Sequence, residues 1–422
     1  MGKPIIIAGI DIGSNNICCV VGMYNSESGL VKIIDAIRKQ CDGIKAGSIT
    51  NIQEAALCMK GIIEKLEKSL DEPIKNIVIG IRGNFIISRH SKGIVNMDHV
   101  NKEITFDTIE SVLENARKQI RVDPEQEILQ IVPIEYILNQ QRGIHNPVGM
   151  EGTYIEVSVC AFVAPSNSMK NLTKVLKSLD IENDIRVYGY LTTSDMLVTK
   201  EEKELSCLVI DFGGLTTGLI HYTNGMLSNA DEILDGSDYI TKDIGHKLRT
   251  TYSLSKEIKE TYGAAFIHDN FEDKEFEYKI ADGKSIKKCS RFELVNGVIM
   301  PRVDRIMYKI KELIERNDYG DDFLSGGIIL TGGGAKLPGI TEAFEKVFNC
   351  PVRLGFVNFN KLVGLSDISF DSSYTTAIGA IMYGFSNFNH FNTSKKLQKK
   401  VFKKNIFFRI SKKISKWAEE IF

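Results

Sequence analysis

Apolar residues near the N-terminus fall into three short runs, at 5–10, 17–23 and 30–36. Short apolar runs bounded by turn residues are typical of buried β-strands. An Asp-Gly loop at 11–14 connects the first two runs, and a turn connects the second to the third. The segment therefore predicts a buried strand that leads through an acidic residue into a glycine loop and then into two further strands.

The same pattern returns about two hundred residues later. A strand at 207–210 leads into an Asp-Gly loop at 211–214, and a second strand follows at 217–222. Asn224-Gly225 then predicts a tight hairpin, because Asn-Gly between apolar runs favours the turn types that join two strands. The repeat predicts two similar α/β halves with one Asp-Gly loop each, and two such loops facing each other across a cleft could hold a phosphate chain.

A third strand runs into glycines at 328–339, in the segment IILTGGGAKLPGI. Three glycines permit positive φ angles and a close approach of the backbone to a ligand. A helix predicted at about 338–348 would add amide donors and a positive dipole at its start. One Asp-Gly turn after a strand is most often a simple turn, but three strand-to-glycine units in this order indicate a nucleotide-binding protein.

Composition and charge add a few limits. A chain of 422 residues is too long for one core, so we expect about two to four domains. A net charge of −1 gives no sign of a nucleic-acid partner. The eight cysteines are scattered without a C-x-x-C pair, which indicates reduced, packed thiols in a cytosol. The N-terminal apolar run is too short for a signal peptide, and no apolar stretch reaches the ~20 residues of a spanning helix.

The composition changes after residue 384. Residues 385–396 are polar and rich in asparagine, which predicts a linker, and residues 397–422 predict a basic amphipathic helix. Such a helix with aromatic anchors is typical of one that lies in an anionic membrane interface. Packing against the protein, or binding nucleic acid or a partner helix, stay open as alternatives. The apolar face consists of Ile406, Phe407, Ile410, Ile414, Trp417 and Ile421, and the basic side consists of Lys403, Lys404, Arg409, Lys412, Lys413 and Lys416.

The three glycine units resemble the ATPase superfamily of actin, DnaK-type chaperones and hexokinase. The segment at 127–157 is similar to the small 1C domain that is specific to the FtsA family of bacterial cell division and that MreB and DnaK-type chaperones lack. The resemblance spans roughly 5–384 and implies an α/β, actin-like (ribonuclease H-like) duplicated two-lobe fold, with an inserted α+β 1C domain and a C-terminal amphipathic helix. Four other segments also resemble FtsA: 41–68, 77–95, 235–245 and 374–384.

The resemblance implies a division into domains that the composition alone does not give. The lobes would be built from domains named 1A and 2A, with the smaller domains 1C and 2B attached to them. The implied boundaries are 1–82 and 163–196 for 1A, 83–162 for 1C, 197–235 and 300–384 for 2A, 236–299 for 2B, 385–396 for the linker and 397–422 for the membrane-targeting helix.

The resemblance also implies a nucleotide site for ATP with Mg²⁺. Asp11 and Asp211 would hold the magnesium ion through its waters, because this ion keeps several waters and needs few carboxylates. Gly332, Gly333 and Gly334 would approach the adenosine and the phosphates. The other implied binding residues are Gly13, Ser14 and Asn15 of the first loop, Gly213, Gly214, Thr216 and Thr217 of the second loop, and Gly236 and Lys259 beside the base and ribose.

Five residues depart from the family pattern at this site. They remove a lysine, a close glycine approach and three acidic groups, and one lost charge-assisted hydrogen bond costs about 1.5–3 kcal/mol. Carboxylates that could orient an attacking water are absent, so we expect at most a very weak ATPase. Whether ATP still binds stays open at this point, and so does neutral drift in a loose motif. The five residues are Asn16, Gly189, Leu215, Gly218 and Lys256.

The function implied by the resemblance is that of an actin-like protein that binds ATP, polymerises through 1C and tethers FtsZ filaments to the cytoplasmic face of the cell membrane at the septum. The FtsZ C-terminal peptide would dock on 2B and its edge with 2A, with Arg302 as the best single anchor; nucleic acid is not an expected partner. The alternatives are a membrane adaptor such as the PilM type of pilus assembly, and a sugar-kinase-like or chaperone-like ATPase.

Overall fold

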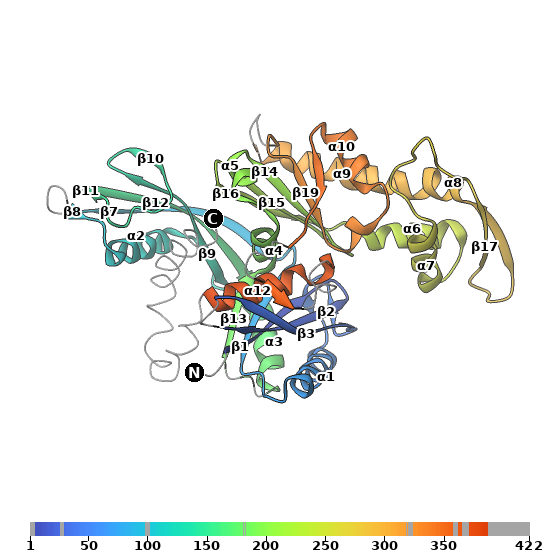
Figure 1. Cartoon of the computed structure of the whole chain (residues 1–422), viewed down its shortest axis with the longest axis horizontal. Coiled ribbons are helices and arrows are strands. Elements are labelled where there is room, and N and C mark those ends of the chain that lie inside the picture. The colour runs from blue at the N-terminus through green and yellow to red at the C-terminus, as the bar shows by residue number, and fades with distance from the viewer. Residues whose placement is uncertain are drawn as a thin grey trace. The chain divides into compact units, whose positions relative to one another are not determined.

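The computed structural model of the chain describes residues 5–25, 29–97, 102–179, 181, 183–317, 319, 324–357, 362–364 and 371–386. Its contacts divide the chain into two compact units (Figure 1). Unit 1 contains the residues up to Met196 and those from Val357 on, and unit 2 contains Leu197–Phe356. The amphipathic helix expected at 397–422 lies outside the described residues. None of the helices in the described ranges is long and apolar enough to cross a membrane.

Unit 1 is built on a six-stranded mixed sheet with the order β13-β6-β1-β2-β3-β21. The predicted glycine loop lies between β1 and β2, which pair antiparallel, and β1 also pairs in parallel with β6. The strands are β1 (Ile5–Ile12), β2 (Asn16–Tyr24), β3 (Val31–Gln40), β6 (Asn76–Ile81), β13 (Asn183–Tyr188) and β21 (Leu362–Gly364), and a small ladder joins β4 (Ile44–Lys45) to β5 (Ser48–Ile49).

Helices cover both faces of this sheet. Ala8 and Ile10 pack into a core with α1 (Ile52–Leu70) and α3 (Ser166–Lys177). Gly9 points to the other face, because side chains alternate along a strand, and a Cβ there would lie 2.0 Å from the backbone oxygen of Ala377 in α12. The two opposite faces can be followed in Figure 1. The remaining helical segments of unit 1 in this part are α4 (Gly189–Leu197), η3 (Ser372–Tyr374) and α12 (Thr375–Ser386).

The position of α12 corrects one expected boundary. We expected residues 300–384 to belong as a block to the second half, but the described residues from Val357 to Ser386 belong to unit 1. The physical reason is close packing: Ile381 of α12 fills the space beside Gly22, and a Cβ on Gly379 would lie 2.2 Å from the backbone oxygen of Thr192 in α4. The glycines Gly22 and Gly379 therefore allow α12 to pack closely in unit 1.

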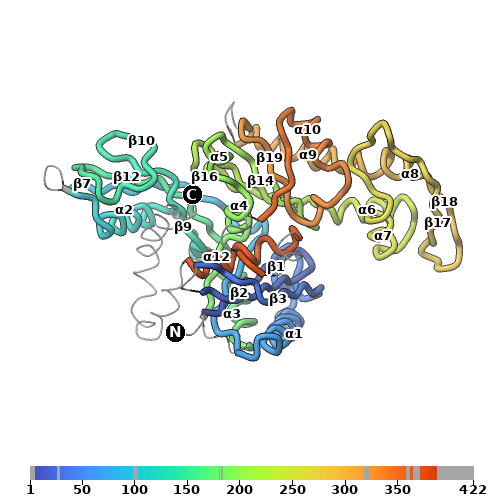
Figure 2. Tube along the Cα trace, in the orientation of Figure 1, coloured from blue at the N-terminus to red at the C-terminus, as the bar shows by residue number. Residues whose placement is uncertain are grey.

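A smaller domain is inserted between β6 and α3. Its sheet has the order β10-β9-β12-β7, and one helix, α2, packs on it. Figure 2 shows the long strands β9 and β12 connecting this domain to the rest of unit 1. At that root, Phe162 of β12 stacks on Tyr188 at 4.1 Å between ring centroids. The elements are β7 (Ile87–Asn96), β8 (Lys102–Glu103), α2 (Phe106–Gln119), β9 (Gln126–Leu138), β10 (Gln141–Ile144), β11 (Glu151–Gly152) and β12 (Tyr154–Pro165).

Unit 2 repeats the sheet of unit 1 with the order β16-β15-β14-β19-β20. Strand by strand, β14, β15, β16, β19 and β20 correspond to β1, β2, β3, β6 and β13, which confirms the predicted duplication. Asn224 and Gly225 have φ angles of 51° and 79°, so the predicted tight hairpin is also confirmed. The strands are β14 (Cys207–Phe212), β15 (Thr217–Thr223), β16 (Met226–Ile233), β19 (Ile328–Thr331) and β20 (Val352–Leu354).

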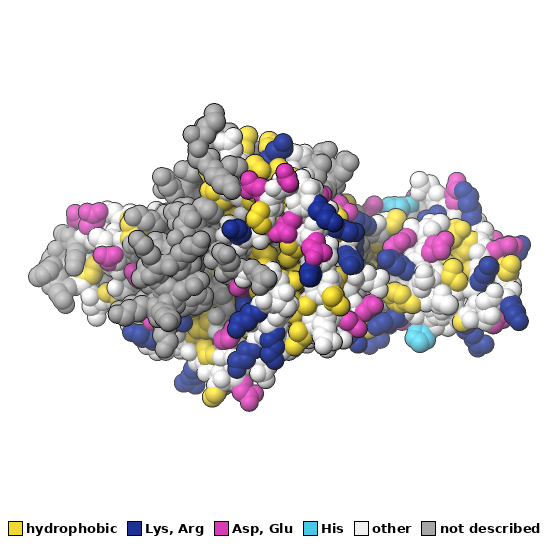
Figure 3. Space-filling model, turned by 90° about the horizontal axis from the view of Figure 1, so that it is seen from below, with side chains coloured by type: hydrophobic (Ala, Val, Ile, Leu, Met, Phe, Trp, Pro, Cys, Tyr) yellow, Lys and Arg dark blue, Asp and Glu magenta, His cyan; other side chains and the backbone are white. Residues whose placement is uncertain are grey.

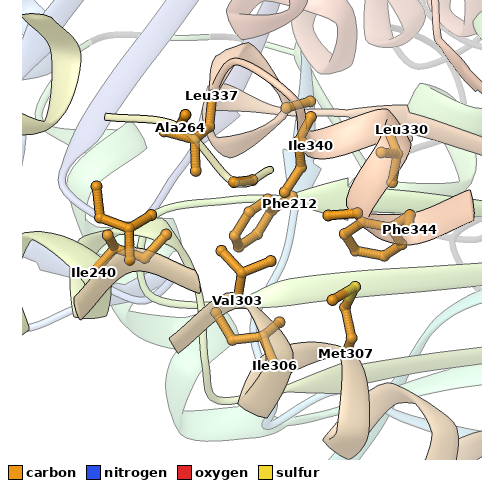
Figure 4. Packing of buried hydrophobic residues seen from close by; sticks show 14 of the residues in the cluster. Phe212, Ile240, Ala264, Val303, Ile306, Met307, Leu330, Leu337, Ile340 and Phe344 are labelled. Carbon is orange, nitrogen blue, oxygen red and sulfur yellow. The ribbon is translucent and has the colours of Figure 1, made fainter. Parts of the chain in front are cut away.

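The core of unit 2 lies between this sheet and its helices. Figure 4 shows Phe212 surrounded by apolar side chains that include Val303 and Ile306 of α9 and Ile340 and Phe344 of α10. The helical segments are α5 (Lys200–Glu204), α6 (Ser237–Leu248), α7 (Tyr252–Tyr262), α8 (Arg291–Leu294), η1 (Val295–Ile299), α9 (Met300–Arg316), η2 (Gly333–Lys336) and α10 (Ile340–Phe348), and a separate hairpin joins β17 (Glu275–Lys279) to β18 (Ile286–Ser290).

Charged side chains of both signs are distributed over the molecular surface. In the space-filling view, Lys, Arg, Asp and Glu side chains all occur on the visible face (Figure 3). This distribution agrees with a net charge of −1 for the whole chain. On the described part of this face, Lys and Arg side chains are thus interspersed with Asp and Glu side chains.

Candidate phosphate-binding loops

The first glycine loop is held from behind by a neighbouring turn. The amide of Gly13 donates to the Asn16 carbonyl at 3.0 Å. The carbonyls of Gly13 and Ser14 accept hydrogen bonds from the amides of Gly47 at 3.2 Å and Ala46 at 3.0 Å. Since the N–H and C=O of a trans peptide point in opposite directions, the amides of Ser14 and Asn15 point away from that turn.

The second loop uses the same geometry with different supports. The amide of Gly213 donates to the Thr216 carbonyl at 3.0 Å. The amides of Ser237 and Asp238, at the start of α6, donate to the carbonyls of Gly213 at 2.9 Å and Gly214 at 2.8 Å. The amides that follow these carbonyls therefore point away from α6. Successive amides directed to one side form a concave surface that binds phosphate oxygens.

The predicted glycine triad lies against the second loop. Gly332 has a φ of 86°, and a Cβ on it would lie 2.4 Å from Oδ1 of Asp211. A Cβ on Gly334 would lie 2.6 Å from the ring of Phe212. Side chains do not fit at these two positions, so only glycine lets the backbone approach the buried Asp211 this closely. The structure thus brings the second loop and the triad together within unit 2.

Gly236 and Lys259 belong to the same group of residues. A Cβ on Gly236 would lie 2.5 Å from the backbone oxygen of Gly214, which explains the glycine. Nζ of Lys259 donates to the backbone oxygen of Ser237 at 3.1 Å, and burial lowers the pKa of its ammonium group. Lys259 therefore places a positive charge beside the start of α6.

The two threonines of the second loop are internal. Thr216 and Thr217 are both buried, and the hydroxyl of Thr217 donates to the backbone oxygen of Asp235 at 2.7 Å. That hydroxyl hydrogen is used to fix the segment before Gly236. Leu215 is also largely buried, with 8% of its surface exposed. The side chain of Leu215, the apolar residue of the loop, is thus largely buried within unit 2.

The structure also describes the surroundings of Gly218, Asn16 and Lys256, three other residues that depart from the family pattern. Gly218 lies in β15 directly opposite Asp211, and Asn16 is the first residue of β2. Lys256 is exposed on α7 and approaches Glu260 at 3.9 Å. This exposed pair contributes little to stability, because surface ion pairs are screened by water.

Arg82, which follows β6 and contacts Asp11 beside the first loop, is a residue that sequence reasoning missed. Its Nη2 lies 2.5 Å from Oδ2 of Asp11, and the two side chains are only 15% and 4% exposed. The Arg82 guanidinium also lies 5.4 Å from the ring centre of Tyr190. Gly189 makes room for it, since a Cβ there would lie 2.7 Å from Cγ of Arg82. A nearly buried ion pair thus joins the end of β1 to the residue that follows β6.

Arg302, the expected peptide anchor, forms internal ion pairs. Its Nε and Nη2 donate to the two carboxylate oxygens of Asp243 at 2.5 and 2.9 Å. Its Nη1 lies 3.6 Å from Asp235, which also pairs with Lys309. These contacts raise the pKa of Arg302, chiefly through the hydrogen bonds to Asp243. With 14% of its side chain exposed, Arg302 joins α9 to α6 rather than facing solvent.

We expect Arg302→Ala to lower the free energy of unfolding of unit 2 by about 1.5–3 kcal/mol, because it leaves the carboxylate of Asp243 without its bidentate partner. Arg305→Ala is the matched control, since Arg305 is exposed on the same helix and should change stability by less than ~0.5 kcal/mol. Urea denaturation of both variants checks this. Equal midpoints for the two would contradict the structural role of Arg302.

Within the described residues, no group of three or more His, Cys, Asp or Glu side chains could hold a metal ion. The eight cysteines are free thiols and seven of them are buried. Burial raises the pKa of the Cys18 thiol, with the charge of Asp11 as the second cause. The cysteines of this region therefore act as apolar core residues.

Comparison with protein families gives two matches. The family model described as cell division protein FtsA matches residues 208–379, and the model described as the SHS2 domain inserted in FtsA matches residues 83–163. The chain is 31% identical to the cell division protein FtsA of Borreliella burgdorferi, with 98% of each chain covered. It is 28% identical to that of Escherichia coli, with 94% of each covered.

Solved structures show the same fold at low identity. The PilM-PilN type IV pilus biogenesis complex matches with a TM-score of 0.63 at 14% identity, covering 90% of this chain and 98% of that chain. MreB 5 of Spiroplasma citri bound to AMPPNP matches with a TM-score of 0.55 at 15% identity, covering 94% and 100%. These likenesses confirm the expected actin-like fold, and at such identities they show the fold alone.

Proposed function

Because the chain belongs to the FtsA family of cell division proteins, we propose that it is an actin-like scaffold that binds ATP, assembles with copies of itself and tethers FtsZ filaments to the membrane. The observation that carries the nucleotide part is the shared geometry of the two glycine loops. Each loop has its carbonyls bonded from behind and its next amides directed the other way. The MreB 5 structure of the same fold is described as bound to AMPPNP, which supports the proposal.

Binding without efficient hydrolysis is the role that these residues favour. Gly189 and Gly218 have no side chain that could orient an attacking water, and the carboxylate of Asp11 faces Arg82. Positioning of the water is a main contribution of the protein to phosphoryl transfer. We therefore propose that the bound nucleotide controls assembly and that the chain is at most a very weak ATPase.

The membrane and FtsZ roles rest on the family and on the sequence. We propose that residues 397–422 bind an anionic membrane surface and that the inserted domain takes part in self-association. For the acidic FtsZ peptide, exposed cations of 2B and of its edge with 2A are better suited than Arg302, whose guanidinium is engaged by Asp243 and Asp235. Lys287 and Lys288 of β18 and Arg305 of α9 are exposed and have the required charge.

Calorimetric titration with ATP and Mg²⁺ tests the nucleotide site. We expect a micromolar dissociation constant. Lys259→Ala should weaken binding about tenfold or more, because one charge-assisted contact is worth ~1.5–3 kcal/mol. Lys256→Ala is the control on the same helix, where an exposed lysine is removed instead, and it should bind as tightly as the unchanged chain. A folded protein that shows no heat of ATP binding would refute this function.

A further inference from the structure

The duplicated sheets give an internal standard for comparing the two halves. In unit 1, β1 and β6 pair so that Asp11 lies beside Gly80. In unit 2, β14 and β19 pair so that Asp211 lies beside Thr331. Two residues further along, Arg82 therefore corresponds to Gly333, the middle glycine of the triad. The same position of the sheet thus has a glycine without a side chain in unit 2 and an arginine in unit 1.

The surroundings of these two positions differ in the same way. A Cβ on Gly333 would meet nothing within 4 Å, whereas Arg82 lies against the first loop. A Cβ on Gly13 would be 3.6 Å from Nη2 of Arg82 and 4.0 Å from Oδ2 of Asp11. The guanidinium head group is thus next to both the acidic residue and the glycine of the loop.

The rest of unit 1 is shaped to hold this side chain. Gly189 lacks the side chain that would displace it, and the ring of Tyr190 lies under the guanidinium at 5.4 Å. An arginine against an aromatic ring is stabilised by cation–π attraction of about 0.5–2 kcal/mol. Arg82 is therefore accommodated by its surroundings in unit 1: the space beside Gly189, the ring of Tyr190 and the carboxylate of Asp11.

The position of Arg82 decides which cation the first loop uses. A magnesium ion is held in such sites by one or two carboxylates, their waters and the substrate phosphates. At Asp11 the carboxylate already carries a guanidinium at 2.5 Å, and a second cation near the same oxygen would be repelled by it. The Oδ2 atom of Asp11, which faces the guanidinium, does not fit magnesium, whereas a planar guanidinium binds phosphate oxygens through two parallel hydrogen bonds.

We propose that Arg82 is the resident cation of the first phosphate loop, and that it takes the place of a divalent metal ion there when the chain binds the triphosphate of a nucleotide. The contribution of the first loop to ATP affinity is then independent of magnesium. This inference rests on the proposed nucleotide binding and concerns Asp11 alone. The pairing with Asp11 orients the head group, and the outward amides of Ser14 and Asn15 lie on the same loop.

The test is ATP calorimetry on the full chain, once with Mg²⁺ and once with EDTA. We expect the dissociation constants of the unchanged chain to agree within about threefold, a difference of under 1 kcal/mol. Arg82→Ala should weaken binding in EDTA by about tenfold or more, and magnesium should restore part of the loss. Arg82→Lys should recover an intermediate affinity in EDTA. Arg89→Ala removes an exposed arginine on β7 and should match the unchanged chain.

The outcomes separate this inference from the function on which it rests. Binding by the unchanged chain that requires magnesium would overturn the role of Arg82 and leave nucleotide binding intact. If Arg82→Ala binds ATP in EDTA as tightly as the unchanged chain, the role of Arg82 is likewise overturned and nucleotide binding is left intact. Failure of the unchanged chain to bind ATP in either buffer would overturn both. If Arg82→Ala does not fold, Arg82→Gln keeps most of the stem beside Gly189 and gives the same readout.

Discussion

A chain that lacks residues 397–422 is expected to stay in the supernatant when it is mixed with anionic vesicles that sediment the full chain. The sequence of the segment contains eight Lys and Arg residues together with apolar residues such as Ile410, Ile414 and Trp417. Each basic residue near an anionic leaflet contributes about 1 kcal/mol, and burial of the apolar face adds to this. Loss of both contributions removes binding almost completely, which a sedimentation assay measures directly.

Two controls belong to this experiment. The truncated chain should unfold at the same temperature as the full chain, since the deletion begins eleven residues after Ser386, the last residue of α12. The full chain should sediment less with neutral vesicles and less at high salt, because screening weakens attraction between exposed charges. Undiminished sedimentation of the truncated chain would show that another surface binds the membrane.

The second large effect is expected at the glycine triad. Gly332→Ala should destabilise unit 2 by about 3 kcal/mol or more, because the backbone there has a φ of 86° and a ψ of 174°, a region reserved for glycine. The new Cβ would also lie 2.4 Å from Oδ1 of Asp211. Urea denaturation measures the loss, and the same variant should lose ATP binding because the second loop is displaced.

Gly333→Ala is the matched control for this prediction. It makes the same chemical change one residue further along, where a Cβ meets nothing within 4 Å and φ is not positive. We expect a change in unfolding free energy within about 0.5 kcal/mol. If the two alanine variants prove equally stable, the strained contact between Gly332 and Asp211 is not the reason for the glycine.

The two glycine loops were predictable because their signals are local. Asp11 and Asp211 each end an apolar strand and precede a glycine, and the strands that follow are short and apolar. Turn chemistry and strand periodicity are read within ten residues, so β1, β2, β14 and β15 followed from the sequence. The family resemblance then supplied the actin-like arrangement, which local patterns alone do not contain.

Arg82 was not predictable because its partner is distant in the sequence. Seventy-one residues separate it from Asp11, and their contact depends on the register of β1 with β6. The lack of a side chain at Gly189 is equally necessary. At the sequence level Gly189 looked like a lost carboxylate, whereas in the structure it provides the space for an arginine.

The same dependence on contacts that are distant in the sequence explains why the packing of α12 and the partners of Arg302 were not predictable. The helix Thr375–Ser386 is apolar on nearly all sides, so its sequence fits the core of either unit and only the glycines Gly9 and Gly22 determine which sheet accepts it. Arg302 follows Pro301 at a helix start, which indicates its position but not its partners. The acidic partners of Arg302 are Asp243 in α6 and Asp235 just before α6, about sixty residues earlier in the chain.

The stacking of Phe162 on Tyr188 has a mechanical consequence for the inserted domain. Phe162 lies near one end of β12, whose 12 residues span about 40 Å. Tyr188 in turn contacts Tyr190, the ring under Arg82. Because β12 is paired with β7 and β9, it is a rigid strand. Its contact point at Phe162 connects through Tyr188 and Tyr190 to Arg82 beside the first phosphate loop. Eight residues, about 26 Å, separate Phe162 from the far end of β12 at Tyr154. A tilt of about 5° at Phe162 would therefore displace that end of the inserted domain by about 2 Å.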